Sequence, residues 1–307
     1  MSEHPRNITA SIHARLANEA KKLGRPFGEI LQYYGMERFL YRFFQTIYAD
    51  NFILKGGFIF YSWGVPMRRP TRDIDFLGLL DNREEIITKV IADAISISAP
   101  EDGLYFDIAT LVVDVTQVDA DRKGIRANFL GYLDRAQILI QIDFGFSDEI
   151  TSEAVVRSYP TILQGMNGPQ IKSYPVESVV AEKFHAMERY ADVPSRWKDY
   201  YDLWLISENF ELDDQPLQKA IAKTFEKRVT IIPSGRPVSL TIDFASKYSK
   251  NWRTFLKKSD LENSEINDLV LLIEKIWAFL EWPLQGLVAP NTYRDSRHWF
   301  PSERKWE

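Results

Sequence analysis

The sequence predicts an α+β protein of two domains: a mixed β-sheet domain with N-terminal helices over residues 1–165, and a mainly helical domain over 166–307. Three observations predict this. Apolar residues recur at three- and four-residue spacing over residues 9–48, the period of amphipathic helices. Over residues 104–146 the apolar pattern changes to period two, which is typical of β-strands. After about residue 170 the helical period returns.

The elements are predicted in a simple order along the chain. Residues 9–48 form two helices, because Gly24 and Pro26 are typical of a helix end and a turn. The next elements are a buried strand at 52–54, a helix at 58–63, a strand at 74–80, a helix at 83–97, and β-branched strand runs at 108–116 and 138–144 separated by a turn at 121–124. The clearest later helices are at 176–190, 198–207, 217–228 and 266–279.

Composition excludes several classes of protein. A chain of 307 residues with 45% hydrophobic residues can bury two cores and is not disordered. With no cysteine it forms no disulfide, thiolate zinc site or cysteine nucleophile, and its four histidines lack metal-ligand spacing. The net charge of −5 does not attract nucleic acid globally, so an RNA partner would need a local basic patch. With no signal segment and no apolar run of about 20 residues, we expect a cytoplasmic protein without a membrane partner.

A glycine pair and two nearby carboxylates carry the strongest functional signal. Gly56 and Gly57 follow the first predicted strand, and because glycine has no Cβ and tolerates positive φ, such a turn lets the backbone approach a phosphate. Asp73 and Asp75 lie two apart, so on a strand both side chains leave the same face. Carboxylates this close repel each other unless a cation lies between them, which favours a divalent metal, Mg²⁺ or Mn²⁺.

A third carboxylate for such a site is expected from a neighbouring strand, and Asp143 is the best candidate. Alternation places Asp143 and Gln141 on one face of their strand, opposite a run of apolar residues. A lone acid in so apolar a strand needs a metal or a nearby cation as partner. Asp73, Asp75 and Asp143 are therefore the predicted metal ligands.

Simpler explanations exist for each of these residues taken alone. Asp73 and Asp75 could belong to a turn or to an ion-pair cluster with the neighbouring arginines, which are Arg68, Arg69 and Arg72. Asp143 could be a solvent-facing acid at the end of a strand, and the two glycines could serve tight packing. The order and spacing of the signals favour the functional interpretation.

A second group of charged residues lies downstream. Lys183 is beside the apolar stripe of its predicted helix, where its long stem could reach a β- or γ-phosphate. Asp199 and Asp202 are three residues apart and so share a helix face, and Pro194 separates the two helices into a hairpin. The alternative is that all three are ordinary solvated helix charges. His185 is assigned no role.

In their order and spacing these residues resemble the AbiEii/AbiGii nucleotidyl transferase toxins, over roughly residues 50–207. The motifs that carry the resemblance are Lys55-Gly56-Gly57, Arg69-Pro70-Thr71-Arg72-Asp73-Ile74-Asp75, Ile142-Asp143-Phe144-Gly145-Phe146, Ala181-Glu182-Lys183 and Lys198-Asp199-Tyr200-Tyr201-Asp202-Leu203. The resemblance implies a nucleotidyltransferase fold related to DNA polymerase beta, followed by a helical region. It further implies a toxin of a bacterial toxin–antitoxin or abortive-infection system, with a cognate antitoxin as partner.

The resemblance also implies an activity and a set of site residues. The expected reaction is Mg²⁺-dependent transfer of NMP from an NTP to an RNA acceptor, with the 3′ end of tRNA as one candidate. The implied catalytic residues are Asp73, Asp75, Asp143, Lys183, Asp199 and Asp202. The implied phosphate-binding residues are Lys55, Gly56, Gly57, Arg69, Thr71, Arg72 and Lys183. The wider superfamily often has Gly-Ser at the turn, and here the flanking basic residues could supply the missing hydrogen-bond donors. Whether Asp143 or Asp199 completes the catalytic carboxylates stays open.

Two other functions fit parts of the pattern. A nucleotide- or RNA-binding module with a decayed site would keep the fold, but the intact acids and Lys183 argue against decay. A phosphohydrolase of the haloacid dehalogenase type also has a D-x-D after a strand, although Phe76 and Leu77 stand where that group favours small or hydroxyl residues. The aromatic and basic C-terminus could stack on bases or pack on the helical domain, and we favour packing; its residues are Arg294, Arg297, Trp299, Phe300, Arg304, Lys305 and Trp306.

Overall fold

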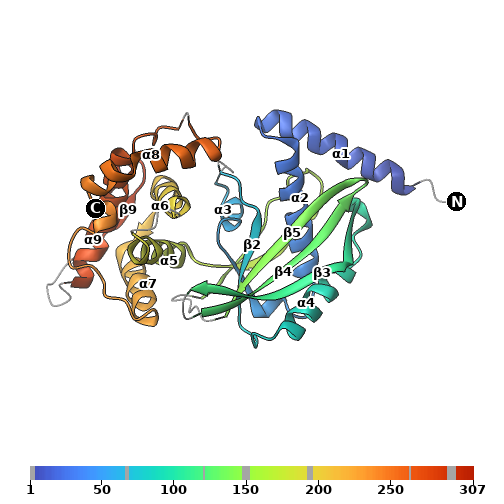
Figure 1. Cartoon of the computed structure of the whole chain (residues 1–307), viewed down its shortest axis with the longest axis horizontal. Coiled ribbons are helices and arrows are strands. Elements are labelled where there is room, and N and C mark those ends of the chain that lie inside the picture. The colour runs from blue at the N-terminus through green and yellow to red at the C-terminus, as the bar shows by residue number, and fades with distance from the viewer. Residues whose placement is uncertain are drawn as a thin grey trace. The chain divides into compact units, whose positions relative to one another are not determined.

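A computed structural model describes residues 4–65, 69–119, 122–146, 153–191, 196–262, 264–288 and 295–307. These residues form two compact units (Figure 1). The first holds the described residues up to Phe146 together with Ala154–Tyr174, and the second holds Glu153 and Pro175–Glu307. Each unit buries its own apolar side chains.

Two helices open the first unit, as predicted. Helix α1 spans His4–Leu23 and α2 spans Phe27–Phe43. Between them Gly24 has a φ of +63°, a left-handed conformation that glycine adopts without strain and that is common just after a helix. Helix α2 ends five residues before the predicted boundary at residue 48, and most of its side chains are buried. It is therefore the central helix of this unit.

A seven-stranded mixed sheet forms the body of the first unit. Its strand order is β3-β4-β5-β2-β1-β7-β6, with parallel pairing between β2 and β5 and between β1 and β7. The strands are β1 Phe52–Lys55, β2 Asp73–Gly78, β3 Leu104–Asp119, β4 Arg122–Leu133, β5 Ala136–Gly145, β6 Val155–Ser158 and β7 Gln170–Ser173. The helical segments between them are η1 Ala49–Asn51, α3 Ile59–Ser62, α4 Glu84–Ser96 and η2 Pro100–Asp102. The predicted mixed-sheet domain is confirmed.

The predicted turn at residues 121–124 is wrong where the structure describes it. Residues 122–124 begin β4, and Asp121 lies outside the described residues. Strand β4 pairs with β3 from Arg122 onward, so turn-type residues are drawn into a long hairpin. A whole strand thus lies between the two predicted β-branched runs, where polar residues and glycine weaken the strand signal.

The two faces of the sheet differ in chemistry. On one face apolar side chains of β2 and β5 are buried with residues of α2 and α4; Phe43 of α2 stacks on Phe76 of β2 with ring centroids 4.7 Å apart. On the other face of β5, Gln141 and Asp143 are only half-buried. The predicted alternation in β5 is therefore confirmed, and it puts the acid on the face opposite the apolar core.

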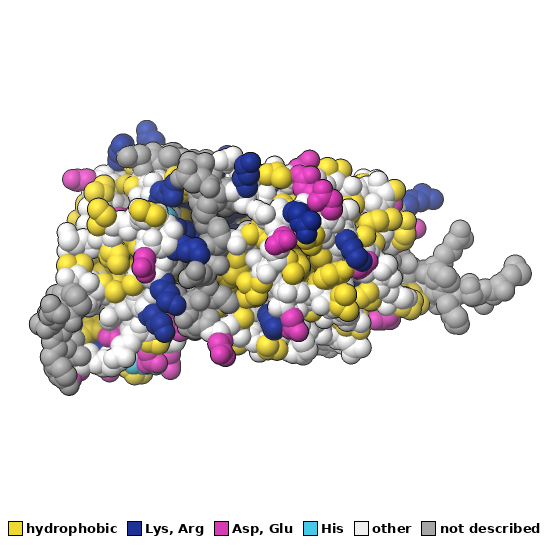
Figure 2. Space-filling view, turned by 90° about the horizontal axis from the view of Figure 1, so that it is seen from below, with side chains coloured by type: hydrophobic (Ala, Val, Ile, Leu, Met, Phe, Trp, Pro, Cys, Tyr) yellow, Lys and Arg dark blue, Asp and Glu magenta, His cyan; other side chains and the backbone are white. Residues whose placement is uncertain are grey.

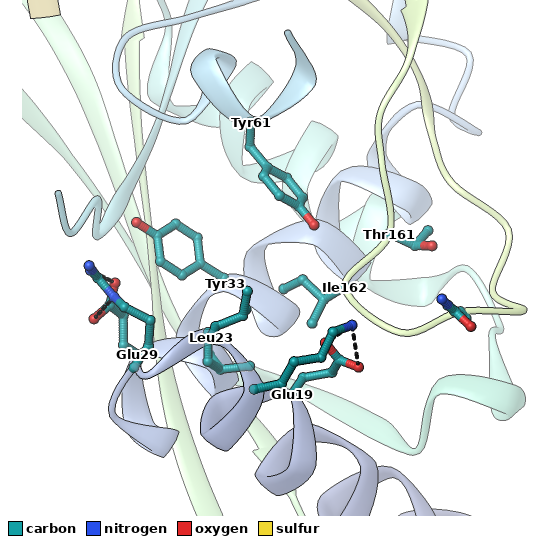
Figure 3. A pocket seen from close by; sticks show the side chains of 11 residues that line it. Glu19, Leu23, Glu29, Tyr33, Tyr61, Thr161 and Ile162 are labelled. Atoms are coloured by element: carbon teal, nitrogen blue, oxygen red, sulfur yellow. Dashed lines mark hydrogen bonds and ion pairs between the residues drawn. The ribbon is translucent and has the colours of Figure 1, made fainter. Parts of the chain in front are cut away.

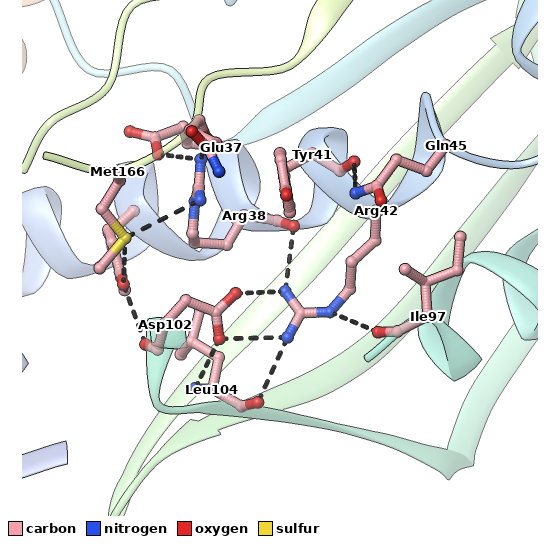
Figure 4. A network of polar contacts seen from close by, with 11 residues as sticks. Glu37, Arg38, Tyr41, Arg42, Gln45, Ile97, Asp102, Leu104 and Met166 are labelled. Carbon is pink, nitrogen blue, oxygen red and sulfur yellow. Dashed lines mark hydrogen bonds and ion pairs between the residues drawn. The ribbon is translucent and has the colours of Figure 1, made fainter. Parts of the chain in front are cut away.

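A buried polar network fastens α2 to its surroundings (Figure 4). Arg42 donates to both carboxylate oxygens of Asp102, at 2.6 and 3.1 Å, and their side chains are 4% and 0% exposed. Glu37 accepts a hydrogen bond of 2.6 Å from the backbone N–H of Ile162 and pairs with Arg38. Burial raises the pKa of Glu37 to about 7, although Arg38 opposes the shift. These contacts hold the loops at residues 97–104 and 162–167 against the helix.

The second unit is mainly helical, as predicted. Its helices are α5 Val176–Arg189, α6 Trp197–Asn209, α7 Asp214–Lys227, η3 Val238–Leu240, α8 Ile242–Lys258 and α9 Leu269–Val288, and a small sheet contains β8 Leu212–Asp213, β9 His298–Phe300 and β10 Lys305–Trp306. Trp299 and Trp306 are buried, and their indole N–H groups donate to backbone carbonyls. These two tryptophans therefore pack inside the helical unit rather than forming an exposed stacking surface; Arg294 lies outside the described residues.

In the described part of the chain, no helix has the length and apolar character of a membrane span.

Candidate active site

The glycine turn after β1 is packed directly against β2, the strand that carries Asp73 and Asp75. Gly56 has a φ of +70°, and a Cβ added to it would lie 1.9 Å from Oδ2 of Asp75. A Cβ on Gly57 would lie 2.8 Å from Oγ1 of Thr71 and 2.9 Å from a guanidinium nitrogen of Arg69. Real Cβ atoms do not come this close, so Gly56 requires glycine for this packing, whereas a Cβ on Gly57 would require the Arg69 and Thr71 side chains to shift.

The structure brings Asp73, Asp75 and Asp143 together. Because β2 and β5 pair in parallel, Asp75 lies opposite Asp143, and Asp73 lies opposite Gln141. One carboxylate oxygen from each acid lies within 4.8 Å of the others, and all three side chains are half-buried. Three carboxylates at this spacing form an oxygen-only ligand set of the kind that hard divalent cations prefer. We call these three residues the acidic triad.

Arg126 on β4 belongs to the same cluster. Its Nε and one terminal nitrogen donate to the two carboxylate oxygens of Asp143, at 2.6 and 2.8 Å, and Gln141 donates to one of them at 3.3 Å. The hydrogen bonds that Arg126 donates to Asp143, together with the charges of Asp73 and Asp75, hold the pKa of Arg126 above its ordinary value. The sequence prediction missed Arg126 because it missed β4. The available signal was the alternation at residues 125–129, in which apolar positions flank Arg126.

Charged residues form a row across five neighbouring strands on this face. The pairing registers place the row in the order Asp114, Arg126, Asp143, Asp75 and Lys55. Cations thus stand at both ends of the central acid pair, with Arg126 on one side and Lys55 on the other. Side chains directly opposite one another on neighbouring strands share a face, so the row follows from the register alone. It offsets part of the repulsion between the clustered carboxylates.

Tyr33 of α2 holds the loop before β2. Its hydroxyl accepts a hydrogen bond of 2.9 Å from the backbone N–H of Thr71 and donates one of 3.2 Å to the carbonyl of Arg69. Burial raises the pKa of Tyr33, so the hydroxyl keeps its proton.

Tyr33 and Tyr61 line a cavity of about 400 Å³ formed by α1, α2, α3 and residues 161–164 (Figure 3). The Arg69 side chain lies beside Gly57, Arg72 is exposed, and Arg68 lies outside the described residues.

The downstream charged residues form a buried ion cluster in the helical unit. The ammonium group of Lys183 on α5 lies 2.6 Å from a carboxylate oxygen of Asp202 and 3.1 Å from one of Asp199, both on α6. The three side chains are 12%, 1% and 13% exposed, so they are not ordinary solvated helix charges. His185 contacts Thr230 and Arg228 through its two ring nitrogens, which fits a structural residue. Pro194 lies outside the described residues.

A mixed sheet that presents three carboxylates beside a glycine turn is the arrangement of a nucleotidyltransferase. Comparison with family models places the chain more specifically, because the model described as "Nucleotidyl transferase AbiEii toxin, Type IV TA system" matches residues 38–282. This is more than half of the chain, so the protein belongs to the AbiEii nucleotidyl transferase toxin family. The matched range contains every predicted site residue, from Lys55 to Asp202. The family resemblance in the sequence is confirmed.

Two solved structures from Helicobacter pylori are similar to this chain. One, a protein proposed to be a nucleotidyltransferase, has 14% sequence identity and a TM-score of 0.47, and the alignment covers 86% of this chain and 98% of that one. The other, JHP933, has 14% identity and a TM-score of 0.45, with coverage of 85% and 97%. A comparison with curated proteins finds no match.

Proposed function

We propose that this toxin transfers a nucleoside monophosphate from an NTP to the 3′ hydroxyl of an RNA acceptor, with tRNA as the first candidate. The observation that carries the proposal is the acidic triad, whose carboxylate oxygens lie within 4.8 Å of one another beside a glycine turn. Family membership supports nucleotidyl transfer, and a toxin of this family implies an antitoxin partner. NTPs and tRNA are cytoplasmic, so the proposed reaction takes place there.

The triad fits a divalent metal ion by its chemistry. All three candidate ligands are carboxylates, and the described residues near them include no thiolate or imidazole that would select a softer metal. Asp73, Asp75 and Asp143 would hold Mg²⁺ or Mn²⁺. When bound, such an ion neutralises charge on the α-phosphate and lowers the barrier to attack on phosphorus.

The remaining residues position the NTP and its charges. The backbone N–H groups of Gly56 and Gly57 are proposed phosphate ligands, because a turn that contains a left-handed residue such as Gly56 can present consecutive N–H groups to an anion. Lys55, Arg69, Thr71 and Arg72 flank this turn and supply cationic and hydroxyl donors. Within the helical unit, Asp199 and Asp202 fix the ammonium group of Lys183, which stays the phosphate ligand that the family resemblance implies.

The proposed chemical step is a single displacement. The acceptor hydroxyl oxygen forms a bond to the α-phosphorus while the bond from that phosphorus to the bridging oxygen breaks, and pyrophosphate leaves with the electron pair. The hydroxyl proton passes to a carboxylate of the triad. We propose Asp143 rather than Asp199 as the third carboxylate of this set, since Asp143 lies beside Asp75 and Asp199 is engaged by Lys183 in the other unit.

RNA contact is proposed to depend on local residues. The net charge is −5, and on the face in Figure 2 basic and acidic side chains are scattered among hydrophobic ones. An acceptor would therefore be guided by particular cations near the site rather than by a field of the whole molecule.

The test is incubation of the purified protein with each α-³²P-labelled NTP, Mg²⁺ and total tRNA. Asp73→Asn removes one triad charge, and Asp81→Asn, at a well-exposed acid that pairs with Arg83 two residues away, is the matched control. We expect label on RNA with wild type and Asp81→Asn, and none with Asp73→Asn or with EDTA. Absence of label from wild type with every NTP, on tRNA and on total RNA, would refute the proposed acceptor.

A further inference from the structure

Arg126 is hydrogen-bonded to Asp143, the third carboxylate of the triad. The forked guanidinium group of Arg126 contacts both oxygens of Asp143, at 2.6 and 2.8 Å, and the second oxygen also accepts a hydrogen bond from Gln141. Bidentate pairs of this kind are short, charge-assisted and specific in geometry. Three of the four lone pairs of the Asp143 carboxylate are therefore already engaged, two of them by a cation of the protein itself.

The pair is more open to solvent than the ion pair that anchors α2. In the same unit, Arg42 and Asp102 are almost completely buried. They also bond to backbone groups of the loop at residues 97–104 (Figure 4). By contrast, the Arg126 and Asp143 side chains are 42% and 25% exposed. Ion pairs that face solvent contribute little to stability. A bidentate ion pair that is partly exposed to solvent and lies beside two further acids indicates a functional role for Arg126.

We propose that Arg126 is the resident counter-cation of the acidic triad, and that a divalent metal ion competes with it for Asp143. This inference rests on the metal site of the proposed function. Without metal, Arg126 offsets the repulsion among the three carboxylates and keeps Asp143 in place. A metal ion that coordinates an oxygen of Asp143 weakens the two hydrogen bonds between Arg126 and Asp143. Arg126 therefore lowers the affinity of the nucleotide-free protein for metal.

The competition has a nucleotide-dependent consequence. A guanidinium group released from Asp143 stays on β4 next to the triad, where it can pair with an anionic phosphate. Metal and NTP would then each favour the arrangement that the other needs, and by linkage each raises the affinity for the other by the same factor. Arg126 thereby restricts metal loading to molecules that also bind a nucleotide.

The decisive experiment measures Mn²⁺ binding by electron paramagnetic resonance without nucleotide, in wild type, Arg126→Met and Arg126→Lys. Arg135→Met is the control, because Arg135 is an exposed arginine on the turn between β4 and β5 and its loss changes the net charge equally. A single and a double positive charge about 6 Å apart in a water-like medium repel enough to change Kd roughly tenfold, or about 1.4 kcal/mol. We expect Arg126→Met to bind Mn²⁺ about tenfold more tightly than wild type.

The lysine variant keeps the charge but cannot form the fork, so its affinity should rise by a smaller factor. Arg135→Met should bind as wild type does. Thermal unfolding of each variant shows whether it is folded. If Arg126→Met does not fold, the Mn²⁺ affinity of Arg126→Lys is compared with that of wild type instead. Unchanged or weaker Mn²⁺ binding in either folded Arg126 variant would overturn the inference and make Arg126 a support for metal binding.

Asp73→Asn, made alone and with Arg126→Met, separates this inference from the proposed function. Loss of Mn²⁺ binding in both backgrounds shows that the triad is the metal site. If Asp73→Asn abolishes binding while Arg126→Met does not tighten it, only the role of Arg126 fails. If Asp73→Asn leaves Mn²⁺ binding intact, or no variant binds the ion, the metal site itself is wrong and the inference falls with it.

Discussion

Replacement of Gly56 by alanine tests how closely the glycine turn and the triad depend on each other. Gly56 has a φ of +70°, and a left-handed conformation costs alanine about 1–2 kcal/mol. Its new Cβ would also lie 1.9 Å from Oδ2 and 2.8 Å from Cβ of Asp75. Rotation of the Asp75 side chain moves Oδ2 but not its Cβ, so the turn and β2 must separate. Such overpacking adds about 1–3 kcal/mol.

Gly64 is the matched control, because its φ is +74° and no atom of the described residues lies within 4 Å of an added Cβ. Gly64→Ala should therefore lose only the conformational part, about 1–2 kcal/mol, and keep nucleotidyl transfer. Gly56→Ala should lose about 2–5 kcal/mol in total and at least ~100-fold in kcat/KM, because displacement of a catalytic group by about 1 Å can cost that much.

The assay combines thermal unfolding, monitored by circular dichroism, with the labelled-NTP transfer reaction. Each kcal/mol lowers Tm by about 2–4 °C for a domain of this size. Two results would refute the reasoning. Gly56→Ala could retain wild-type activity, which would mean that Asp75 tolerates displacement. Gly64→Ala could instead lose as much activity as Gly56→Ala, which would make backbone strain, rather than contact with Asp75, the cause.

Three further predictions concern other parts of the molecule. Tyr33→Phe removes the hydroxyl that accepts from the Thr71 N–H, so we expect a stability loss of about 1 kcal/mol and a several-fold rise in KM for NTP, measured by steady-state kinetics. Lys183→Met leaves the buried Asp202 carboxylate without its cation and should cost about 3–5 kcal/mol in urea unfolding; adding Asp202→Asn should recover part of this, and no recovery would contradict the ion-pair explanation. Glu37 has its pKa raised from 4.5 to about 7, so the folded state binds its proton more tightly than the unfolded state, and its contribution to stability falls as pH rises from 4.5 to 7. Glu37→Gln should flatten that slope in urea midpoints, and an unchanged slope would exclude Glu37 as its source.

Local patterns in the sequence were sufficient for much of the first unit. Side-chain alternation in β5 places Asp143 opposite the apolar face whatever strand lies beside it, because the period of two is a property of a single strand. The same holds for Asp73 and Asp75 on β2. The helices α1 and α2 follow from the period of their apolar residues and from the stop at Gly24. These features depend on neighbours within a few residues.

Strand β4 shows where local reasoning failed. Its interior holds Arg126, Asn128 and Gly131, which weaken a propensity-based prediction. Pairing on both sides, with β3 and β5, nevertheless draws the segment into the sheet. Tertiary pairing outweighed propensity there, and the loss of this strand from the prediction also hid Arg126.

The sequence by itself determined the residue types and the faces they occupy: a glycine pair after a strand, two acids on one face of the next, and a third acid on the polar face of another. Only the tertiary structure decided which strands lie side by side. Parallel pairing of β2 with β5 places Asp75 opposite Asp143, and pairing of β4 with β5 gives Asp143 an arginine partner. The burial of Lys183 with Asp199 and Asp202 was likewise decided by helix packing. The physical reason is that periodicity is set by a few consecutive residues, whereas register and burial arise from contacts between segments far apart in the chain.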